Sequence, residues 1–162
     1  MPSGGVRGVA PITSIITGTD EELPYVVLDS DRHGRDMAKK LTSNIYVGAD
    51  NRLLMIRDFR DVADAEIEDL FPTDLLAKAV ARYLRGKTDA EEEFDEVVED
   101  SRPLVQQVVQ YAKRHAIEPD LGWKVEVAKA VKGRLLRNPD SMKSKEGLVD
   151  TWNELFDRLQ SD

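Results

Sequence analysis

Two aspartates one residue apart, at the end of an apolar run, are the part of the sequence best suited to chemistry. Asp29 and Asp31 follow the run at residues 25–28, and Gly34 comes shortly after them. At the tip of a strand, where the chain turns, alternate side chains can lean toward one point. Two carboxylates gathered there repel each other unless a cation lies between them, and oxygen ligands suit a divalent metal. A helix N-cap needs only one of the two carboxylates. The pair therefore predicts a metal site.

Three further acids follow the next predicted strand along the chain. Asp58 comes after the strand predicted at residues 52–56, and Glu66 and Glu68 follow within a short loop and a helical turn. In an open parallel sheet, ligands bind beyond the carboxyl ends of the strands. We therefore expect five carboxylates at one sheet edge. One or two Mg²⁺ or Mn²⁺ ions there would neutralise them, orient a phosphodiester and activate a water.

The elements that must position these acids are predicted to form a small α/β unit. Strands are predicted at residues 25–28 and 52–56, with a helix at residues 34–41 between them. This order favours a right-handed crossover and a parallel sheet. Upstream, residues 4–10 are predicted as a short strand or loop. Residues 11–18 are predicted as one or two helical turns that begin at the proline.

The rest of the chain is predicted to be helical. A long helical stretch capped by Asp64 is broken at Phe71-Pro72 and resumes over residues 74–85. The acidic run at residues 89–100 carries Phe94 and two valines at helical spacing, which is typical of a solvated helix face. Three more amphipathic helices are predicted at residues 103–115, 123–137 and 143–159. We expect an α/β domain over residues 1–86 and an all-helical C-terminal extension over residues 87–162.

Composition narrows the class of protein. The chain has 162 residues, which suit one domain or one domain with an appendage. A net charge of -8 argues against a protein that coats nucleic acid, but it leaves room for a nucleic-acid enzyme. The absence of Cys excludes disulfides and thiolate zinc sites, and two His are few for a His-based metal centre. With no apolar run long enough for a bilayer and no secretory signal at the start, we expect a cytoplasmic protein without a membrane partner.

Two motifs carry a resemblance to a known family. Asp29-Ser30-Asp31-Arg32-His33-Gly34 resembles the Asp-x-Asp-x-x-Gly signature of Toprim domains, which occur in topoisomerases, primases and several nucleases; type IA topoisomerases have Glu where this chain has His33. The later Glu66-Ile67-Glu68-Asp69-Leu70-Phe71-Pro72 resembles the acidic motif of the overcoming-lysogenization-defect (OLD) nucleases. In those enzymes the Toprim domain follows an ABC-type ATPase domain. Gly4-Gly5 is similar to the glycine-bearing strand before the Asp-x-Asp strand. The resemblance covers roughly the first half of the chain.

The resemblance implies a fold and an activity. The fold is Toprim-like, and so Rossmann-like, with a small, mostly parallel sheet flanked by helices. The activity is cleavage of DNA by a two-metal mechanism with Mg²⁺ or Mn²⁺. Four acids match the metal ligands of that family: Asp29, Asp31, Glu66 and Glu68. In that family a Lys on a later helix stabilises charge on the phosphate. The stretch at residues 123–128 resembles the segment that carries it, which makes Lys124 the match.

One departure from the family concerns its first strand. Toprim domains begin with a strand and a Glu that serves as metal ligand or acid/base, and nothing before Gly4 matches it; Glu21 and Glu22 lie just ahead of the Asp-x-Asp strand. The chain is therefore expected to be the C-terminal part of an OLD-like nuclease, without its first Toprim strand and ATPase domain, and its activity alone stays open. Expected partners are DNA, an ABC-type ATPase domain or subunit, and a second copy.

Two other functions compete with the nuclease. One is a non-catalytic interaction module that docks on an ATPase partner or self-associates. The other is a phosphate-accepting receiver domain, which would have an isolated acceptor Asp after a later strand. The paired acids at Asp29 and Asp31 and at Glu66 and Glu68 suit a Toprim domain better than a receiver.

Overall fold

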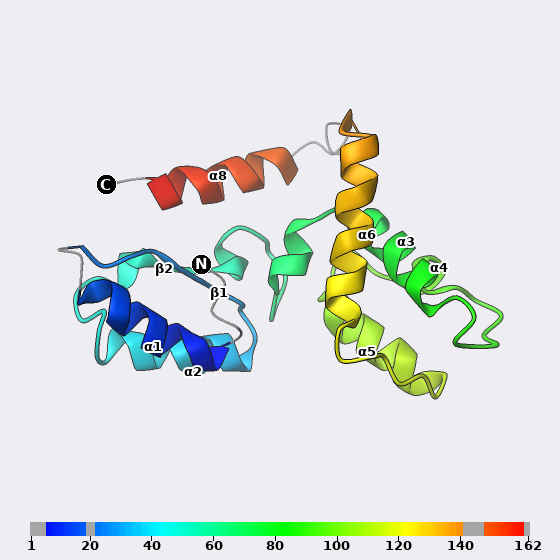
Figure 1. Cartoon of the computed structure of the whole chain (residues 1–162), viewed down its shortest axis with the longest axis horizontal. Coiled ribbons are helices and arrows are strands. Elements are labelled where there is room, and N and C mark those ends of the chain that lie inside the picture. Colours follow the sequence, from blue (N-terminus) through cyan, green and yellow to red (C-terminus); the bar gives the residue numbers. More distant parts are fainter. Residues whose placement is uncertain (1–5, 19–21, 141–147, 161–162) are drawn as a thin grey trace. The chain divides into compact units, whose positions relative to one another are not determined.

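The computed structural model describes residues 6–18, 22–140 and 148–160 (Figure 1). In these residues the protein is mixed α/β, mostly helical, with one small two-stranded parallel sheet. The chain divides into two compact units, Met1–Glu66 and Ile67–Asp162. The division separates Glu66 from Glu68, whereas the sequence placed a domain boundary after Gly86.

The first unit contains the strand, helix and strand expected from the sequence. Its main elements are α1 (Val6–Thr17), β1 (Val26–Leu28), α2 (Arg32–Thr42) and β2 (Leu53–Met55), with short 3-10 helices η1 (Asp50–Arg52) and η2 (Ile56–Asp58) on either side of β2. The predicted parallel pairing is confirmed, because Val26 lies opposite Leu53 and Leu28 opposite Met55. The β-branched residues of β1 favour an extended backbone on a half-buried surface.

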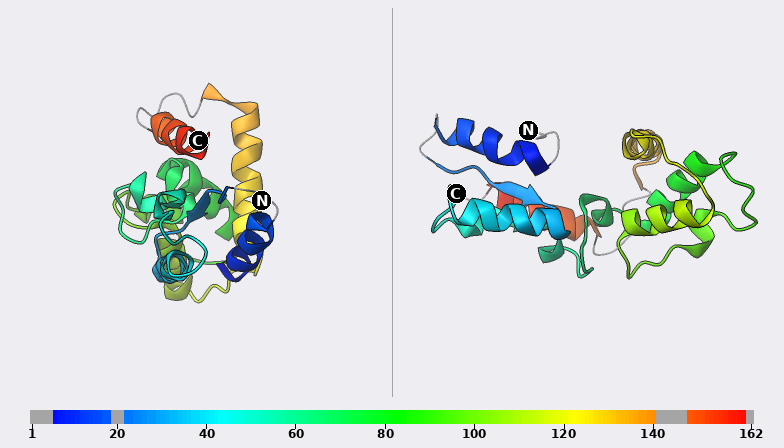
Figure 2. Two further views of the ribbon diagram at one scale, coloured as in Figure 1. Left: turned by 90° about the vertical axis from the view of Figure 1, so that its left-hand side faces the viewer. Right: turned by 90° about the horizontal axis from the view of Figure 1, so that it is seen from below.

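A small apolar core holds the first unit together. Val9 of α1, Leu28 of β1 and Met37 and Leu41 of α2 form one buried cluster with Tyr46. Met37 and Leu41 are four residues apart and so lie on the same face of α2. The buried Tyr46 hydroxyl donates a hydrogen bond of 2.7 Å to a backbone carbonyl, that of Pro24. Both α1 and α2 can be followed beside the strands in Figures 1 and 2.

The prediction of a strand or loop at residues 4–10 is wrong for its described part, because α1 begins at Val6. Pro11 lies inside this helix and not at its first position. Val9 and Thr13, four residues apart, are both buried, so packing on one helix face outweighs the amide that Pro11 lacks. Gly4 and Gly5 lie outside the described residues.

All the regular elements in the described part of the second unit are helices. Its elements are η3 (Ile67–Leu70), α3 (Thr73–Leu84), α4 (Phe94–Val97), α5 (Leu104–Arg114), α6 (Trp123–Arg137) and α8 (Leu148–Gln160). The helices predicted at residues 103–115 and 123–137 are confirmed by α5 and α6. Of the helix predicted at residues 143–159, the first five residues lie outside the described ones. None of the described helices has the length and apolar character needed to cross a membrane.

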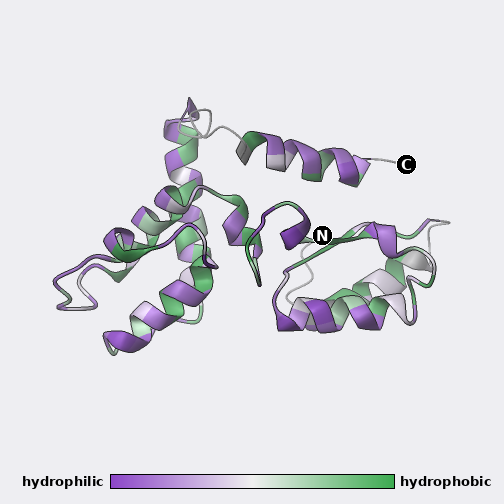
Figure 3. Cartoon of the chain, turned by 180° about the vertical axis from the view of Figure 1, so that it is seen from behind, coloured by the Kyte–Doolittle hydropathy of each residue, from purple (hydrophilic) through white to green (hydrophobic). Residues whose placement is uncertain are grey.

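The core of the second unit joins α3, α4, α5 and α6. Val80, Phe94 and Val108 are almost completely buried in it, and the ring of Phe94 stands edge-on to Tyr111 with centroids 5.5 Å apart. The C-terminal helix α8 is attached through Trp152, whose Nε1 donates a 2.8 Å hydrogen bond to a backbone carbonyl of η3. Figure 3 shows hydrophobic and hydrophilic residues alternating around α8, as in an amphipathic helix.

Two helical predictions are wrong in part. Asp64 does not cap a helix: its φ is 58°, in the left-handed region, and η3 begins only at Ile67. In the acidic run at residues 89–100, only Phe94–Val97 is helical. Beyond it, the side-chain oxygen of Gln107 accepts a 2.8 Å hydrogen bond from the Glu99 backbone N–H. This tertiary contact holds the chain extended where its local sequence favours a helix.

Candidate functional site

The chain passes from β1 into α2 through a turn made of Asp29, Ser30 and Asp31. Asp31 is the N-cap of α2, and its Oδ1 accepts a 2.8 Å hydrogen bond from the Gly34 backbone N–H. Its Oδ2 lies 3.4 Å from Nδ1 of His33. A carboxylate has about four lone-pair positions, so capping leaves Asp31 able to accept further ligands. Asp29 is half-buried directly after the strand. The capping role and the metal role are therefore compatible at Asp31.

Gly34 is required by the packing of this turn. A Cβ atom at Gly34 would lie 1.8 Å from the backbone carbonyl oxygen of Asp29 and 2.8 Å from its carbonyl carbon. These atoms belong to the backbone, so they cannot move aside as a flexible side chain would. The glycine of the Asp-x-Asp-x-x-Gly motif thus lets the first turn of α2 lie directly against the end of β1.

Ser30 is the centre of a polar network that fixes the turn. It is completely buried, and each of its polar groups has a partner. Its N–H donates to the Ala65 carbonyl (2.7 Å), its Oγ accepts from the Arg57 N–H (2.8 Å), and its carbonyl accepts from Nη1 of Arg35. These bonds join the Asp-x-Asp turn to η2, which directly follows β2, and to the residue immediately before Glu66. We call Ser30 and these three hydrogen-bonded partner groups the Ser30 network.

Arg35 also forms an ion pair with Asp64 in the same loop. The hydrogen bond with this carboxylate raises the pKa of Arg35 above its ordinary value. Asp64 has the left-handed φ of 58° noted above, a conformation that Asp tolerates better than most residues. Such backbone strain persists where surrounding contacts enforce it. The sequence reasoning missed Ser30 and gave Asp64 a different role, that of a helix cap. The available signal for Ser30 was its position, as a small residue between two aspartates.

Asp58, the acid after β2, closes its own turn. Its Oδ2 accepts a 3.0 Å hydrogen bond from the Met55 backbone N–H, and the residue is exposed. This is the role of a cap at the start of the short helix η2. Of the acids predicted at the sheet edge, Asp58 thus has a structural role that needs no ligand.

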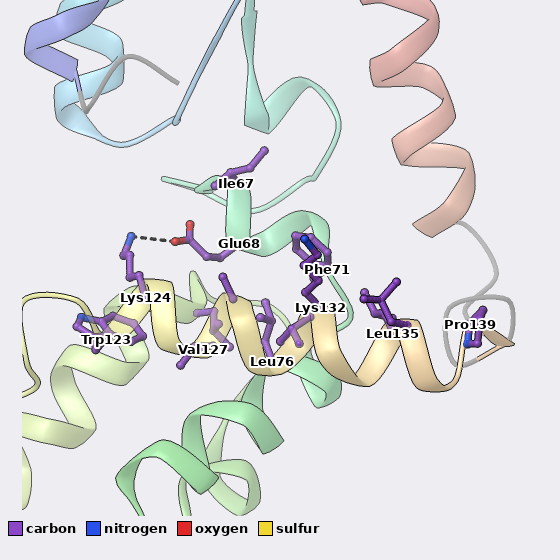
Figure 4. Close-up of a pocket in the computed structure, with 14 residues that line it drawn as sticks. Ile67, Glu68, Phe71, Leu76, Trp123, Lys124, Val127, Lys132, Leu135 and Pro139 are labelled. Carbon is purple, nitrogen blue, oxygen red and sulfur yellow. Dashed lines mark ion pairs between the residues drawn. The ribbon is translucent and has the colours of Figure 1, made fainter. Parts of the chain in front are cut away.

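In the second unit, the structure brings two predicted site residues together. Glu68 of η3 and Lys124 in the first turn of α6 form an ion pair, with Nζ and Oε1 3.1 Å apart (Figure 4). The Glu68 side chain is 23% exposed and that of Lys124 is 42% exposed, so the pair is partly shielded from water. The family resemblance assigned Glu68 to a metal and Lys124 to a phosphate, and the geometry makes each the other's counter-charge.

The arrangement of the predicted carboxylate ligands can be compared with the coordination that a divalent ion requires. Among the described residues, no three Asp, Glu or His side chains gather closely enough to hold a metal ion. The four predicted ligands are divided between the units, with Asp29, Asp31 and Glu66 in the first and Glu68 in the second. Mg²⁺ keeps several waters and takes one or two protein carboxylates plus substrate phosphates. The turn supplies two carboxylates, Asp29 and Asp31, which is the number that such an ion takes from a protein, and the four-ligand set stays a prediction.

Comparisons with known proteins add no relative to this geometry: no family model, no curated protein and no solved structure matches the chain.

Proposed function

We propose that this chain is part of a Toprim-type, OLD-like DNA nuclease that hydrolyses phosphodiester bonds with Mg²⁺ or Mn²⁺. The observation that carries the proposal is the Ser30 network. A helix cap at Asp31 needs only its bond to Gly34. The network does more, because it ties the backbone between the two aspartates to the residue before Glu66. This link supports a site in which the backbone that carries Asp29 and Asp31 is fixed relative to the backbone that carries Glu66.

The residues would divide the work between them. Asp29, Asp31 and Glu66 would hold the ion, with Glu68 as the fourth ligand, and Asp31 would cap α2 at the same time. When bound, a divalent ion supplies charge neutralisation at the phosphate and a more acidic water. Lys124 would leave its ion pair with Glu68 and stabilise negative charge on the phosphate instead. DNA, an ABC-type ATPase domain or subunit and a second copy are the partners of this proposal.

The test is cleavage of supercoiled plasmid DNA with Mg²⁺ or Mn²⁺. The wild-type chain is compared with the double variant Asp29→Asn, Asp31→Asn. Asn caps helices about as well as Asp, so Asp31→Asn keeps the bond to Gly34, and both changes remove a negative charge at nearly the same side-chain size. The matched control is Asp36→Asn, an exposed acid one turn further along α2 that pairs weakly with Arg32 at 3.9 Å.

The expected result is metal-dependent nicking by the wild-type chain and by the Asp36 variant, reduced at least a hundredfold or so in the double variant. Cleavage at the wild-type rate in the double variant would overturn the assignment of Asp29 and Asp31. Cleavage that persists in the presence of EDTA would overturn the dependence on metal.

A further inference from the structure

A long apolar groove runs along α6 in the unit Ile67–Asp162 (Figure 4). It has a volume of about 670 Å³, and its walls include Val127, Val131 and Leu135 of α6 and Phe71, which follows η3. Leu136 at its end is 73% exposed, although it is a large apolar side chain. Contiguous apolar surface left open in this way marks a site that binds another apolar surface.

The shape of the groove indicates what kind of segment it accommodates. The α6 residues that line it recur every three or four positions from Trp123 to Leu136. The groove therefore follows one face of the helix for about 20 Å, at 1.5 Å per residue. A straight apolar channel of this length suits the apolar face of an amphipathic helix, as in helix-in-groove recognition. A small-molecule site is more enclosed and has convergent polar groups.

The charged residues at the groove indicate the charge of the segment that binds there. Glu68 and Lys124 line it and neutralise each other at 3.1 Å. Lys132 also lines it, is exposed, and takes part in no ion pair within the described part of the chain. Arg134 lies nearby in the last turn of α6, where a cation also offsets the helix dipole. The unbalanced charge at the groove is positive, so it is complementary to an acidic partner.

We propose that this groove binds an amphipathic, acidic helix of a partner protein. The apolar face of that helix occupies the groove, and its acidic flank faces Lys132. The same positive charge disfavours a dimer in which α6 packs on α6 of a second copy. This proposal shares Glu68 and Lys124 with the nuclease proposal but uses neither Asp29 nor Asp31, so failure of the peptide test leaves the Asp29, Asp31 test unaffected.

The experiment uses two synthetic, fluorescein-labelled peptides of about sixteen residues. Both have leucines at i, i+3, i+4 and i+7 spacing; one has glutamates on the flanks and the other has lysines. Binding to the full chain is measured by fluorescence anisotropy. We expect the glutamate peptide to bind at least about tenfold more tightly than the lysine peptide. Equal affinities would contradict the charge argument, and no binding of either peptide would overturn the groove as a helix site.

Two matched variants locate the binding. Leu136→Glu places an acid at the exposed end of the groove, whereas Val125→Glu places one on another face of α6, where Val125 is 56% exposed and lines no part of the groove. Since both side chains are exposed, neither change should unfold the unit. Leu136→Glu should weaken binding of the glutamate peptide at least about tenfold and Val125→Glu should not. Equal effects would overturn the location. If the wild-type chain is a dimer and Leu136→Glu dissociates it, the groove binds a second copy of this chain and the proposed partner helix is overturned.

Discussion

Each unit of this protein has an apolar core, but the turn with the candidate ligands in the first unit is fixed differently from the core of the second, and the difference bears on function. In the first unit, the turn that carries Asp29 and Asp31 depends on a few specific contacts. These are the close approach of the backbone at Gly34 and the hydrogen bonds of Ser30. In the second, several buried side chains such as Val80 and Phe94 share one apolar core. A polar network places groups accurately but tolerates little change, whereas an apolar core distributes the effect of a substitution. Accurate placement is what the proposed metal-binding turn would require.

The largest effect is expected for Gly34→Ala. A Cβ atom 1.8 Å from the Asp29 carbonyl oxygen must push α2 away from β1. We expect the first unit to lose about 3 kcal/mol or more of its free energy of unfolding, at the upper end for overpacking. Urea unfolding followed by the NMR signals of the first unit measures this.

Gly133→Ala is the control from the second unit. A Cβ atom there would meet only the end of the Arg137 side chain, at 3.6 Å. Because Ala favours the helix interior, this change should be neutral or stabilise α6 by up to about 1 kcal/mol. Similar stability of the Gly34→Ala and wild-type chains would contradict the close approach of α2 to β1.

A smaller loss is expected for Ser30→Ala. The change removes the Oγ that accepts the Arg57 N–H, and leaves that N–H without its partner. A cost of about 1–3 kcal/mol follows for the first unit, again from denaturant unfolding. Ser43→Ala removes an exposed hydroxyl at the end of α2 and should cost less than about 0.5 kcal/mol. Equal costs for the two serines would mean that the Ser30 network adds nothing.

A gain in stability is expected for Ala116→Gly in the second unit. Ala116 follows the C-terminus of α5 with a φ of 52°, where a glycine avoids the steric penalty of a Cβ atom. We expect about 0.5–1 kcal/mol of stabilisation. Gly86→Ala is the converse change, since Gly86 has a φ of 79°, and it should destabilise. Thermal unfolding of both variants tests the pair, and shifts of the same sign would contradict the backbone argument.

The smallest effect concerns acid pH and an exposed cluster of the second unit. Asp120 accepts hydrogen bonds from Lys87 (2.7 Å) and Tyr83 (2.8 Å), and these lower its pKa below the ordinary value of 3.8. A lowered folded-state pKa stabilises the protein above the ordinary value, and this stability is lost as the pH falls through the folded-state pKa. The stability difference between wild type and Asp120→Asn should therefore shrink below about pH 4. A difference that stays constant would contradict the lowered pKa.

Local patterns predicted much of the fold. The parallel pairing of β1 with β2 and the bounds of α5 and α6 followed from apolar spacing and from the order of the elements. The failures came where a distant partner decides the local conformation. Asp64 was expected to cap a helix, but its ion pair with Arg35 accompanies a left-handed backbone. The acidic run was expected to be helical up to residue 100, but the helix ends at Val97, the backbone is extended at Val98, and Gln107 binds the Glu99 backbone N–H.

The candidate site was predictable in part for the same reason. The spacing of Asp29, Asp31 and Gly34 identified a turn, and the structure supplies a reason for the glycine. The pairing of Glu68 with Lys124 joins residues far apart in the chain, and no local pattern could place them together. The role of Ser30 depends on three segments meeting at one buried residue, through its side chain and its backbone, which only the folded chain reveals.

We propose above all that the Asp-x-Asp turn holds a divalent ion. Mn²⁺ is paramagnetic and broadens the NMR signals of nearby amides, so a titration of the full chain tests the claim directly. We predict that the amides of Ser30, Gly34 and Glu66 broaden first, and that Asp29→Asn, Asp31→Asn abolishes this while Asp36→Asn does not. Broadening that begins in the acidic run at residues 89–100, or that persists at Ser30 in the double variant, would contradict the account.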